Sequence, residues 1–314
     1  FTAIKCNNDP EVARFLADAG IGFDCASKRE IAQVLDLGVE PSRIVFAHPC
    51  KQSSHVQYAA QNNVDLMTFD DLHELVKIKK YYPRARLLLR IKSSREHKAK
   101  HSFNTKFGCD PEAALQLFKH AQNIGLSVVG ISFHVGSLPE VVSSFAASIA
   151  EASRVFKVGE DMGLSMSVLD IGGGFPGVDS DNMTFEKVAD VVNCALDEHF
   201  PVSRNVRIIA EPGRYMVTSG FTLTVSIIAK KTVERRVTDT GTFDIGIPYG
   251  VTHAGTCDIG CPYGVRHVSG HSLKDEITVA EDVDCENRSE RLMYYVNDGI
   301  FGSFNNVFTD HAVI

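Results

Sequence analysis

Short apolar segments rich in β-branched residues alternate with longer amphipathic segments through the first two thirds of the chain. The strand-like segments are Phe1–Cys6, Gly22–Ser27, Arg43–His48, Leu66–Asp70, Arg86–Ile91, Val128–Gly136, Ser165–Gly174 and Val206–Arg214. Helical spacing occurs between them, for example in Pro10–Ala19, Lys28–Leu37, Pro111–Ile124 and Phe185–Phe200. Strands that alternate with helices of about 10–15 residues indicate βαβ units and a parallel sheet.

The number of these units favours a closed barrel over an open sheet. Eight strand–helix units within about 220 residues are typical of a (βα)8, TIM-like barrel. An open doubly wound sheet is the alternative, but it would have fewer strands and a glycine fingerprint after the first one. The sequence lacks that fingerprint, so we expect residues 1–218 to form an α/β barrel.

The pattern changes after the eighth strand-like segment. Phe221–Lys230 and Leu292–Val296 are strand-like, whereas Thr232–Glu290 is polar and rich in turn residues. Within it, the sequence GTFDIGIPYGVTHA is followed by its near copy GTCDIGCPYGVRHV, and together they fill 241–268. Two copies are too few for a solenoid, so we interpret them as a mobile insertion. Residues 219–314 are therefore predicted to form a partial, mainly β domain.

Composition narrows the class of protein. The chain of 314 residues is 44% hydrophobic and 23% charged, as in ordinary globular domains. A net charge of −7 argues against a nucleic-acid surface, and no apolar run reaches the ~20 residues needed to span a bilayer. Eight irregularly spaced cysteines and the absence of a leader favour free thiols in a reducing compartment, so we expect a cytoplasmic protein.

Polar residues and glycines end several of the predicted strands. In barrels of this type the active site lies at the carboxyl ends of the strands. The side chains expected there are Lys5, Asp24, Arg90, His134, Gly172–Gly174 and Glu211–Arg214. Desolvation at a barrel mouth would lower the pKa of Lys5 and prepare it for Schiff-base chemistry. The alternative for a single lysine is an ordinary solvated side chain.

Glycines after two neighbouring strands suggest a phosphate site. Gly172, Gly173 and Gly174 offer consecutive backbone N–H groups, and Gly213 and Arg214 end the next strand. Barrels commonly bind phosphate in the loops after strands seven and eight, and arginine offers a planar fork to phosphate oxygens. A tight turn with a structural ion pair would give the same pattern.

Three further residues have two interpretations each. Glu211 could hold a pyridine nitrogen protonated, or serve as an ordinary ion-pair partner. His134 could stack on a cofactor ring or act as an acid or base, or be a satisfied core histidine. Ser137 could donate its hydroxyl to phosphate, or cap the next helix.

A cluster of metal-ligating residue types lies in and near the duplicated segment. Its members are His253, Cys257, Cys261, His267 and His271. The spacings Cys-x3-Cys and His-x3-His lack a compact knuckle, and the first copy has Phe243 and Ile247 where the second has cysteines. We therefore expect no metal.

The motifs together resemble the eukaryotic ornithine decarboxylase family. FTAIKCN, GIGFDCASKREI, KFG, SFHVGS, LDIGGGFPG, RIIAEPGRYMV, IIAKK and YYVNDGIFGSFN follow one another in the family's order. The resemblance covers nearly the whole chain except the insertion. It implies the alanine-racemase-like architecture: a barrel that binds pyridoxal 5'-phosphate, a β domain and a head-to-tail homodimer with shared active sites.

The resemblance also implies residue roles and a reaction. Lys5 would carry the cofactor, His134 would stack on its ring and Glu211 would pair with its nitrogen. The phosphate would be held by Gly172, Gly173, Gly174, Gly213, Arg214 and Ser137. Asp24 and Arg90 match cofactor-binding positions of the family. Asp310 would receive the distal ammonium of the substrate, and Phe301 would lie near it. The implied reaction converts L-ornithine to putrescine and CO2, the first step of polyamine biosynthesis.

Some positions depart from the family pattern. Leu138 stands where the family has glycine, Phe301 where it has tyrosine and Asn104 where it has serine. The family's Trp-Gly-Pro-Thr-Cys-Asp segment would come after Ile314, and an N-terminal segment of the β domain would precede Phe1, so we expect a piece of a longer protein.

Other functions on the same fold stay open. One is a non-catalytic binding protein similar to the antizyme inhibitors, which tend to lose cofactor-holding residues. Another is a decarboxylase of lysine, diaminopimelate or arginine. Residues 51–81, from KQSSHVQYAA onward, resemble the family's antizyme-binding stretch.

Overall fold

A computed structural model describes residues 1–93, 99–101, 104, 106–222, 224, 226–234, 251–253 and 290–296. The chain divides into two compact units, Phe1–Ser219 and Gly220–Ile314. The predicted domain limits, the missing segments and the loop nature of 241–268 stay predictions. Phe301 and Asp310 lie outside the described residues, as does 241–268 apart from Val251–His253.

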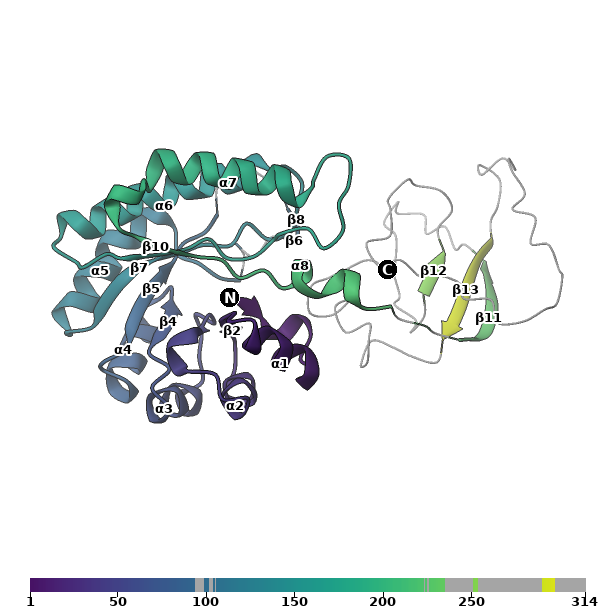
Figure 1. Ribbon diagram of the computed structural model, residues 1–314, viewed down its shortest axis with the longest axis horizontal. Coiled ribbons are helices and arrows are strands. Elements are labelled where there is room, and N and C mark those ends of the chain that lie inside the picture. The colour runs from purple at the N-terminus through teal and green to yellow at the C-terminus, as the bar shows by residue number, and fades with distance from the viewer. Residues whose placement is uncertain are drawn as a thin grey trace. The chain divides into compact units, whose positions relative to one another are not determined.

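The first unit is built on one eight-stranded parallel sheet (Figure 1). In sheet order its strands are β1 (Thr2–Ala3), β2 (Phe23–Cys25), β3 (Ile44–Phe46), β4 (Leu66–Phe69), β5 (Arg86–Arg90), β7 (Ser127–Ser132), β9 (Val168–Asp170) and β10 (Arg207–Ile209). This order follows the chain, as expected for consecutive βα units. The predicted TIM-like barrel is therefore confirmed.

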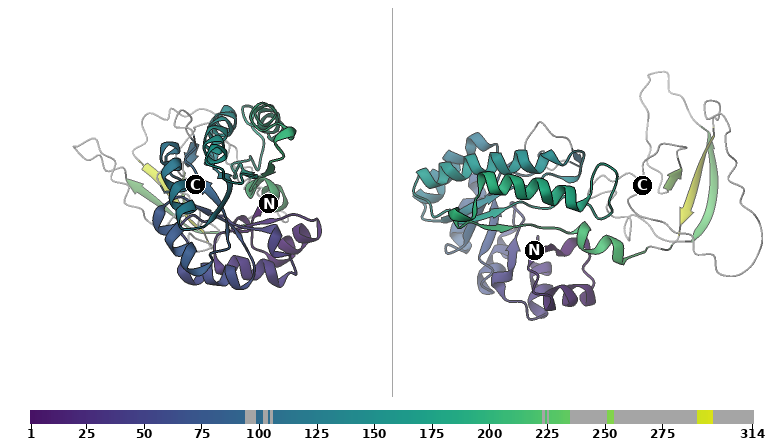
Figure 2. Two further views of the ribbon diagram at one scale, coloured as in Figure 1. Left: turned by 90° about the vertical axis from the view of Figure 1, so that its left-hand side faces the viewer. Right: turned by 45° about the horizontal axis from the view of Figure 1, so that its top comes forward.

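Helices cover the outside of the sheet, as the end-on view in Figure 2 shows. They are α1 (Pro10–Asp18), α2 (Lys28–Asp36), α3 (Ser53–Gln61), α4 (Leu72–Tyr81), α5 (Ala114–Asn123), α6 (Ser143–Asp161) and α7 (Phe185–His199). A short helix, α8 (Arg214–Val217), follows β10. Several begin at a capping side chain: Asp9, Ser27, Asp71 and Thr184 each accept a backbone N–H from the first turn. Short 3-10 turns include η1 (Ile4–Cys6), η2 (Pro41–Arg43), η3 (Pro111–Ala113), η4 (Val202–Arg204) and η5 (Thr218–Gly220).

Backbone contact brings the two edges of the sheet together. The Ala3 N–H donates to the Pro212 carbonyl over 3.2 Å, which joins β1 to the segment after β10. A small apolar cluster then lies apart from the main core; it consists of Val45, Ala47, Leu66, Leu88, Val129, Val168 and Ile209. These residues alternate along their strands with side chains of the main core. This is the inward and outward alternation expected of a barrel wall.

Two features differ from the sequence prediction. The predicted strand Phe1–Cys6 ends at Ala3, and Lys5 lies in the 3-10 turn η1 instead. In addition, β6 (Ala99–His101) pairs with β8 (Ser137–Pro139) in a separate antiparallel ribbon. Ser137 is thus a strand residue and not a helix cap. A pairing between segments so far apart in the sequence leaves no periodic signal in either one.

The second unit contains a three-stranded antiparallel sheet. The long strands β11 (Ile227–Glu234) and β13 (Glu290–Val296) pair with each other, and β12 (Val251–His253) lies on the other side of β13. The strand character predicted for Leu292–Val296 and for the end of Phe221–Lys230 is confirmed. Throughout the described part of the chain, no helix is long and apolar enough to cross a membrane.

Candidate active site

A lysine in the turn after β1 meets a carboxylate of β2. The Lys5 Nζ lies 2.9 Å from Asp24 Oδ2, and the Lys5 side chain is 59% exposed whereas that of Asp24 is 2% exposed. Desolvation lowers the pKa of Lys5, but the charges of Asp24 and Glu211 and the hydrogen bond to Asp24 outweigh it and leave the pKa raised. The predicted lowering is therefore wrong in this state, because the sequence did not show how closely Asp24 approaches.

Two buried carboxyl groups face each other at the ends of β9 and β10. Asp170 and Glu211 interact electrostatically across these neighbouring strands, and both side chains are buried. Burial, followed by the charge of Asp170, raises the pKa of Glu211 well above its ordinary value. Burial also raises the pKa of Asp170, to about 6, although the Gly172 N–H donates to it over 2.9 Å. Such a pair retains a proton near neutral pH.

His134 lies at the mouth as a neutral imidazole. Its Nδ1 accepts the Gly136 N–H over 2.9 Å, which leaves the proton on Nε2. Burial, with help from the positive charges of Arg90 and Lys5, holds the pKa of His134 well below its ordinary value. Because it stays uncharged, His134 can lie against a flat aromatic ring without the cost of burying a charge.

The glycines after β9 form a close backbone cradle. Gly172 and Gly174 have φ of +62° and +107°, a region that residues with a Cβ rarely adopt. A Cβ on Gly173 would lie 2.8 Å from the Glu211 carbonyl oxygen and 3.0 Å from the His134 Nε2. The three glycines are therefore required by the geometry, and they place their backbone beside the histidine and the acid pair.

Arginine and serine complete this side of the mouth. Arg214 begins α8, and its guanidinium donates to Ser137 Oγ over 2.9 Å. Gly213 packs tightly on η1, because a Cβ there would lie 3.0 Å from the Cys6 Cβ. The start of α8 is thereby fixed close to the turn that carries Lys5.

These residues fit a phosphorylated pyridine aldehyde. Glu211 Oε1 and Asp24 Oδ1 are buried and have no hydrogen-bond partner among the described residues. A buried carboxylate oxygen without a partner is costly, and a pyridinium N–H would satisfy that of Glu211. An amine at one side and a glycine–arginine cradle at the other match the aldehyde and phosphate ends of the cofactor.

The structure brings most of the sequence-predicted residues to this mouth and leaves others untested. Lys5, His134, the glycines, Glu211 and Arg214 follow barrel strands. Asp24 lies within β2, Arg90 ends β5 and Ser137 begins β8. Leu138 belongs to β8, but its side chain lies outside the described part. The individual roles of these residues remain predictions.

Three polar residues of the mouth were missed in the sequence. Asp170 ends β9, His48 follows β3 and Asp70 follows β4. His48 packs edge-on against Phe107 with 5.5 Å between ring centroids, and Asp70 Oδ2 accepts the Gly108 N–H over 2.7 Å. Their signal was the same one that identified Arg90, a polar residue at the end of an apolar strand.

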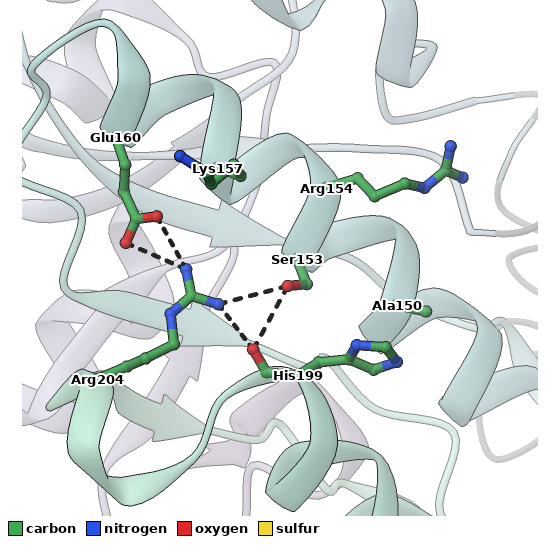
Figure 3. A pocket seen from close by; sticks show the side chains of 7 residues that line it. All are labelled: Ala150, Ser153, Arg154, Lys157, Glu160, His199 and Arg204. Carbon is green, nitrogen blue, oxygen red and sulfur yellow. Dashed lines mark hydrogen bonds and ion pairs between the residues drawn. The ribbon is translucent and has the colours of Figure 1, made fainter.

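A surface hollow of about 620 Å³ lies elsewhere and is not this site. Figure 3 shows its lining residues, which are Ala150, Ser153, Arg154, Lys157, Glu160, His199 and Arg204. They come from α6, from the last turn of α7 and from η4, which precedes β10. The hollow is therefore at the amino-terminal end of the barrel strands. Its central cation, Arg204, is already bound to both Glu160 oxygens and to the His199 carbonyl.

Comparison with known proteins agrees with this geometry. Residues 1–218 match the family model described as pyridoxal-dependent decarboxylase, pyridoxal binding domain. The chain is 42% identical over 313 residues to antizyme inhibitor 2 of Xenopus laevis and 42% identical over 312 residues to ornithine decarboxylase of Rattus norvegicus. Each match covers 99% of this chain but only 59% of the relative.

A solved structure supports the same family. The arginine decarboxylase of Paramecium bursaria Chlorella virus has a TM-score of 0.68 and 35% identity, over 76% of this chain and 62% of that one. An amine, a buried acid pair and a glycine cradle at the mouth of a barrel thus coincide with a matching family domain. The chain belongs to the pyridoxal-dependent decarboxylases, and residues 1–218 form the family's pyridoxal-binding domain.

Proposed function

We propose that the protein decarboxylates L-ornithine to putrescine and CO2 with pyridoxal 5'-phosphate as its cofactor. The observation that supports this most is the unpartnered, buried Oε1 of Glu211, which lies in the same mouth as the Lys5 amine and the Gly172–Gly174 cradle. The similarity to rat ornithine decarboxylase supports the substrate. Because the chain spans 59% of that relative, activity and substrate are proposals for the whole protein.

Lys5 would bind the cofactor through its amine. The bound cofactor supplies an electron sink that accepts the electron pair left when CO2 departs. Asp24 holds the Lys5 ammonium at 2.9 Å and has a second oxygen without a partner. It is therefore placed to take the proton that Lys5 must lose before the amine can react.

Glu211 and His134 would set the electronics of the ring. The Oε1 of Glu211 can accept a pyridinium N–H, and a protonated ring nitrogen withdraws electrons more strongly. The negative charge of Asp170 raises the pKa of Glu211 and so favours a proton shared with the Glu211 carboxylate. His134 stays neutral, so it adds a flat surface without repelling the protonated ring.

The phosphate would be held in the Gly172–Gly174 loop by the N–H groups of Gly173 and Gly174, by Arg214 and by the Ser137 hydroxyl, while the Gly172 N–H donates to Asp170 and fixes the loop. Charge-assisted hydrogen bonds of this kind are about twice as strong as neutral ones. The 2.9 Å bond between Arg214 and Ser137 orients both groups toward one place before any anion arrives. Such preorganisation lowers the ordering cost of binding.

Ornithine is the proposed substrate among the basic amino acids. Asp310 would accept its distal ammonium, and one carboxylate suits a compact ammonium better than a broad guanidinium. Arginine and lysine remain the competing substrates, since the barrel of the viral arginine decarboxylase is similar. Phe301 would lie beside the substrate side chain.

We further propose a cytoplasmic homodimer with shared sites, in which residues 51–81 bind antizyme. The stretch contains α3 and α4 on the outer wall of the barrel. Val76 within it is 56% exposed. The alternative is that these two helices form only the solvated outer wall of the barrel and bind no partner.

A binding protein without catalysis is the second candidate. The similarity to antizyme inhibitor 2 favours it, as do Leu138 and Phe301 at positions where the family has glycine and tyrosine. The presence of Lys5, Asp24, Glu211, Arg90 and Arg214 favours the enzyme.

Absorbance and CO2 release separate the two candidates. With pyridoxal 5'-phosphate, the full chain should show a new band near the visible edge that is lost in Lys5→Ala. Labelled ornithine, lysine and arginine should then release CO2 fastest from ornithine. A wild-type chain with no band would favour the binding protein, and faster release from another substrate would overturn ornithine.

A further inference from the structure

Both halves of the phosphate cradle are followed directly by an aromatic residue. Phe175 comes after Gly174, and Tyr215 comes after Arg214. The two halves follow the paired strands β9 and β10, whose backbone bonds continue to the one between the Glu211 N–H and the Gly172 carbonyl. Gly174 and Arg214 lie beyond that bond, so side-chain packing contributes to their separation. A phosphate bound between them requires that separation to be held, because hydrogen bonds weaken steeply when distance or angle changes.

Phe185, the first residue of α7, contacts both aromatic residues. Its ring lies 6.1 Å from that of Phe175 at 47° and 4.0 Å from that of Tyr215 at 19°, which is a stacked pair. Phe175 in turn packs on Phe145 of α6 with 5.3 Å between centroids. A continuous series of rings therefore joins the core under α6 to the loop after β9 and to α8.

The loop between β9 and α7 also presses against Arg214 itself. A Cβ on Gly177 would lie 2.7 Å from Arg214 Cγ and 2.5 Å from Thr218 Oγ1. The Thr218 hydroxyl donates to the Arg214 carbonyl over 2.8 Å. The stem of Arg214 is thus confined by Gly177 on one side while its guanidinium reaches Ser137.

Phe185 is itself fixed by the loop that precedes it. Its backbone N–H donates to Asp179 Oδ1 over 3.0 Å, and Thr184 caps the helix that it begins. The phenyl ring therefore projects from the start of a 15-residue helix and not from a free loop. This gives the ring a rigid support.

We propose that Phe185 is a positioning residue for the cofactor phosphate: by stacking on Tyr215 and packing on Phe175, it holds Arg214 in register with the Gly172–Gly174 cradle. This inference rests on the proposed cofactor. Phe185 acts through Phe175 and Tyr215, which are next in the chain to Gly174 and Arg214. An aromatic pair contributes about 0.5–1.5 kcal/mol beyond its buried area, enough to set the relative position of two short loops.

Pyridoxal 5'-phosphate and pyridoxal distinguish positioning of the phosphate from general stability, because they differ only in the phosphate. We would measure the dissociation constants of both ligands for the full chain, for Phe185→Ala and for Phe185→Tyr. Phe200→Ala is the matched control, since Phe200 follows the other end of α7 and packs edge-on against Phe156 at 5.3 Å. Phe185→Leu keeps the bulk without the ring, and it replaces the alanine variant if that one does not fold.

The expected result is selective loss of phosphate recognition. Phe185→Ala should weaken pyridoxal 5'-phosphate binding by about tenfold and change pyridoxal binding by less than about twofold, whereas Phe185→Tyr and Phe200→Ala keep the wild-type ratio. An unchanged ratio in Phe185→Ala, or an equal loss for both ligands, would overturn the inference and leave the proposed cofactor standing. A wild-type chain that binds neither ligand would refute the proposed function, and the inference with it.

Discussion

The carboxyl groups of Asp170 and Glu211 are both buried at the adjoining ends of β9 and β10, and the charge of Asp170 raises the pKa of Glu211. Two ionised carboxylates at this distance would repel strongly, so the pair keeps a proton until both pKa values are exceeded. The proton places an acidic group where a pyridine nitrogen would bind. Several properties of the protein follow from this and from neighbouring contacts.

Stability without cofactor should fall as the pH rises across this pair. The folded pKa of Asp170 is raised from 3.8 to about 6, so the folded state holds a proton that the unfolded state loses. The contribution is present below the unfolded pKa and is lost as pH rises from about 4 to about 6. The loss should be on the order of 1–3 kcal/mol.

Asp170→Asn isolates this effect from other titrating groups. Urea unfolding at several pH values should show a smaller decline in the variant than in wild type between those limits. Its amide oxygen can still accept the Gly172 N–H, so the loop is retained. Equal slopes in the two proteins would show that the pair does not share a proton.

Gly174 should tolerate no side chain, because a Cβ there would clash with the backbone in addition to straining its positive φ. Gly174→Ala would place a Cβ 2.7 Å from the Gly136 carbonyl, whereas Gly38, with φ of +82°, has nothing within 4 Å of that position. Gly38→Ala should therefore cost about 1 kcal/mol of unfolding free energy from backbone strain alone. Gly174→Ala should cost about 1–3 kcal/mol more and should weaken cofactor binding. Chemical denaturation of the two variants and a cofactor titration of Gly174→Ala check these expectations. Equal losses of unfolding free energy in the two variants would mean that the glycine loop can adjust to a side chain.

The stability of the fold should depend on the carboxylate that pairs with a buried lysine. Lys51 is inaccessible, and its Nζ lies 3.0 Å from Glu74 Oε1 and 2.6 Å from the Thr68 carbonyl. Glu74→Gln leaves that ammonium without a counter-charge and should cost about 3 kcal/mol. Pairing it with Lys51→Met should restore part of the loss, as urea midpoints would show. A double variant no better than the single one would contradict the interpretation.

Arg204 should be structural and independent of the cofactor. It joins α6 and α7 through Glu160 and the His199 carbonyl (Figure 3). Its guanidinium lies 5.0 Å from the ring centroid of Phe156 and 4.8 Å from that of Phe200. Arg204→Met should lower the unfolding free energy by about 2 kcal/mol, because both the hydrogen bonds and the ring contacts are lost. Cofactor affinity should not change, since these groups lie at the opposite end of the strands; a parallel loss of affinity would argue against that.

The barrel could be predicted because its signal is local and repeated. Each βα unit carries its own period, and Val168–Asp170 followed by three glycines indicates a strand end whatever lies beside it. The link between Asp170 and Glu211 could not be predicted in this way. It depends on the register that places Asp170 beside Ile209, and register between neighbouring strands is not written in either one alone.

The remaining differences have the same origin. Lys5 was expected at the end of a strand, but the chain turns into η1 there, and its contact with Asp24 raises the pKa that desolvation lowers. The ribbon of β6 and β8 and the contact of Phe185 with Tyr215 join segments distant in the chain. The hydrophobic period of a sequence shows which side of a helix or strand is buried. It does not show which other helix or strand packs against that side.

The covalent position of the cofactor tests the central claim most directly. The full chain would be incubated with pyridoxal 5'-phosphate, reduced with borohydride, digested and mapped by mass spectrometry. The account predicts a phosphopyridoxyl group on Lys5 and its absence from Lys5→Arg. A group found on another lysine of the wild type, or on none, would contradict it.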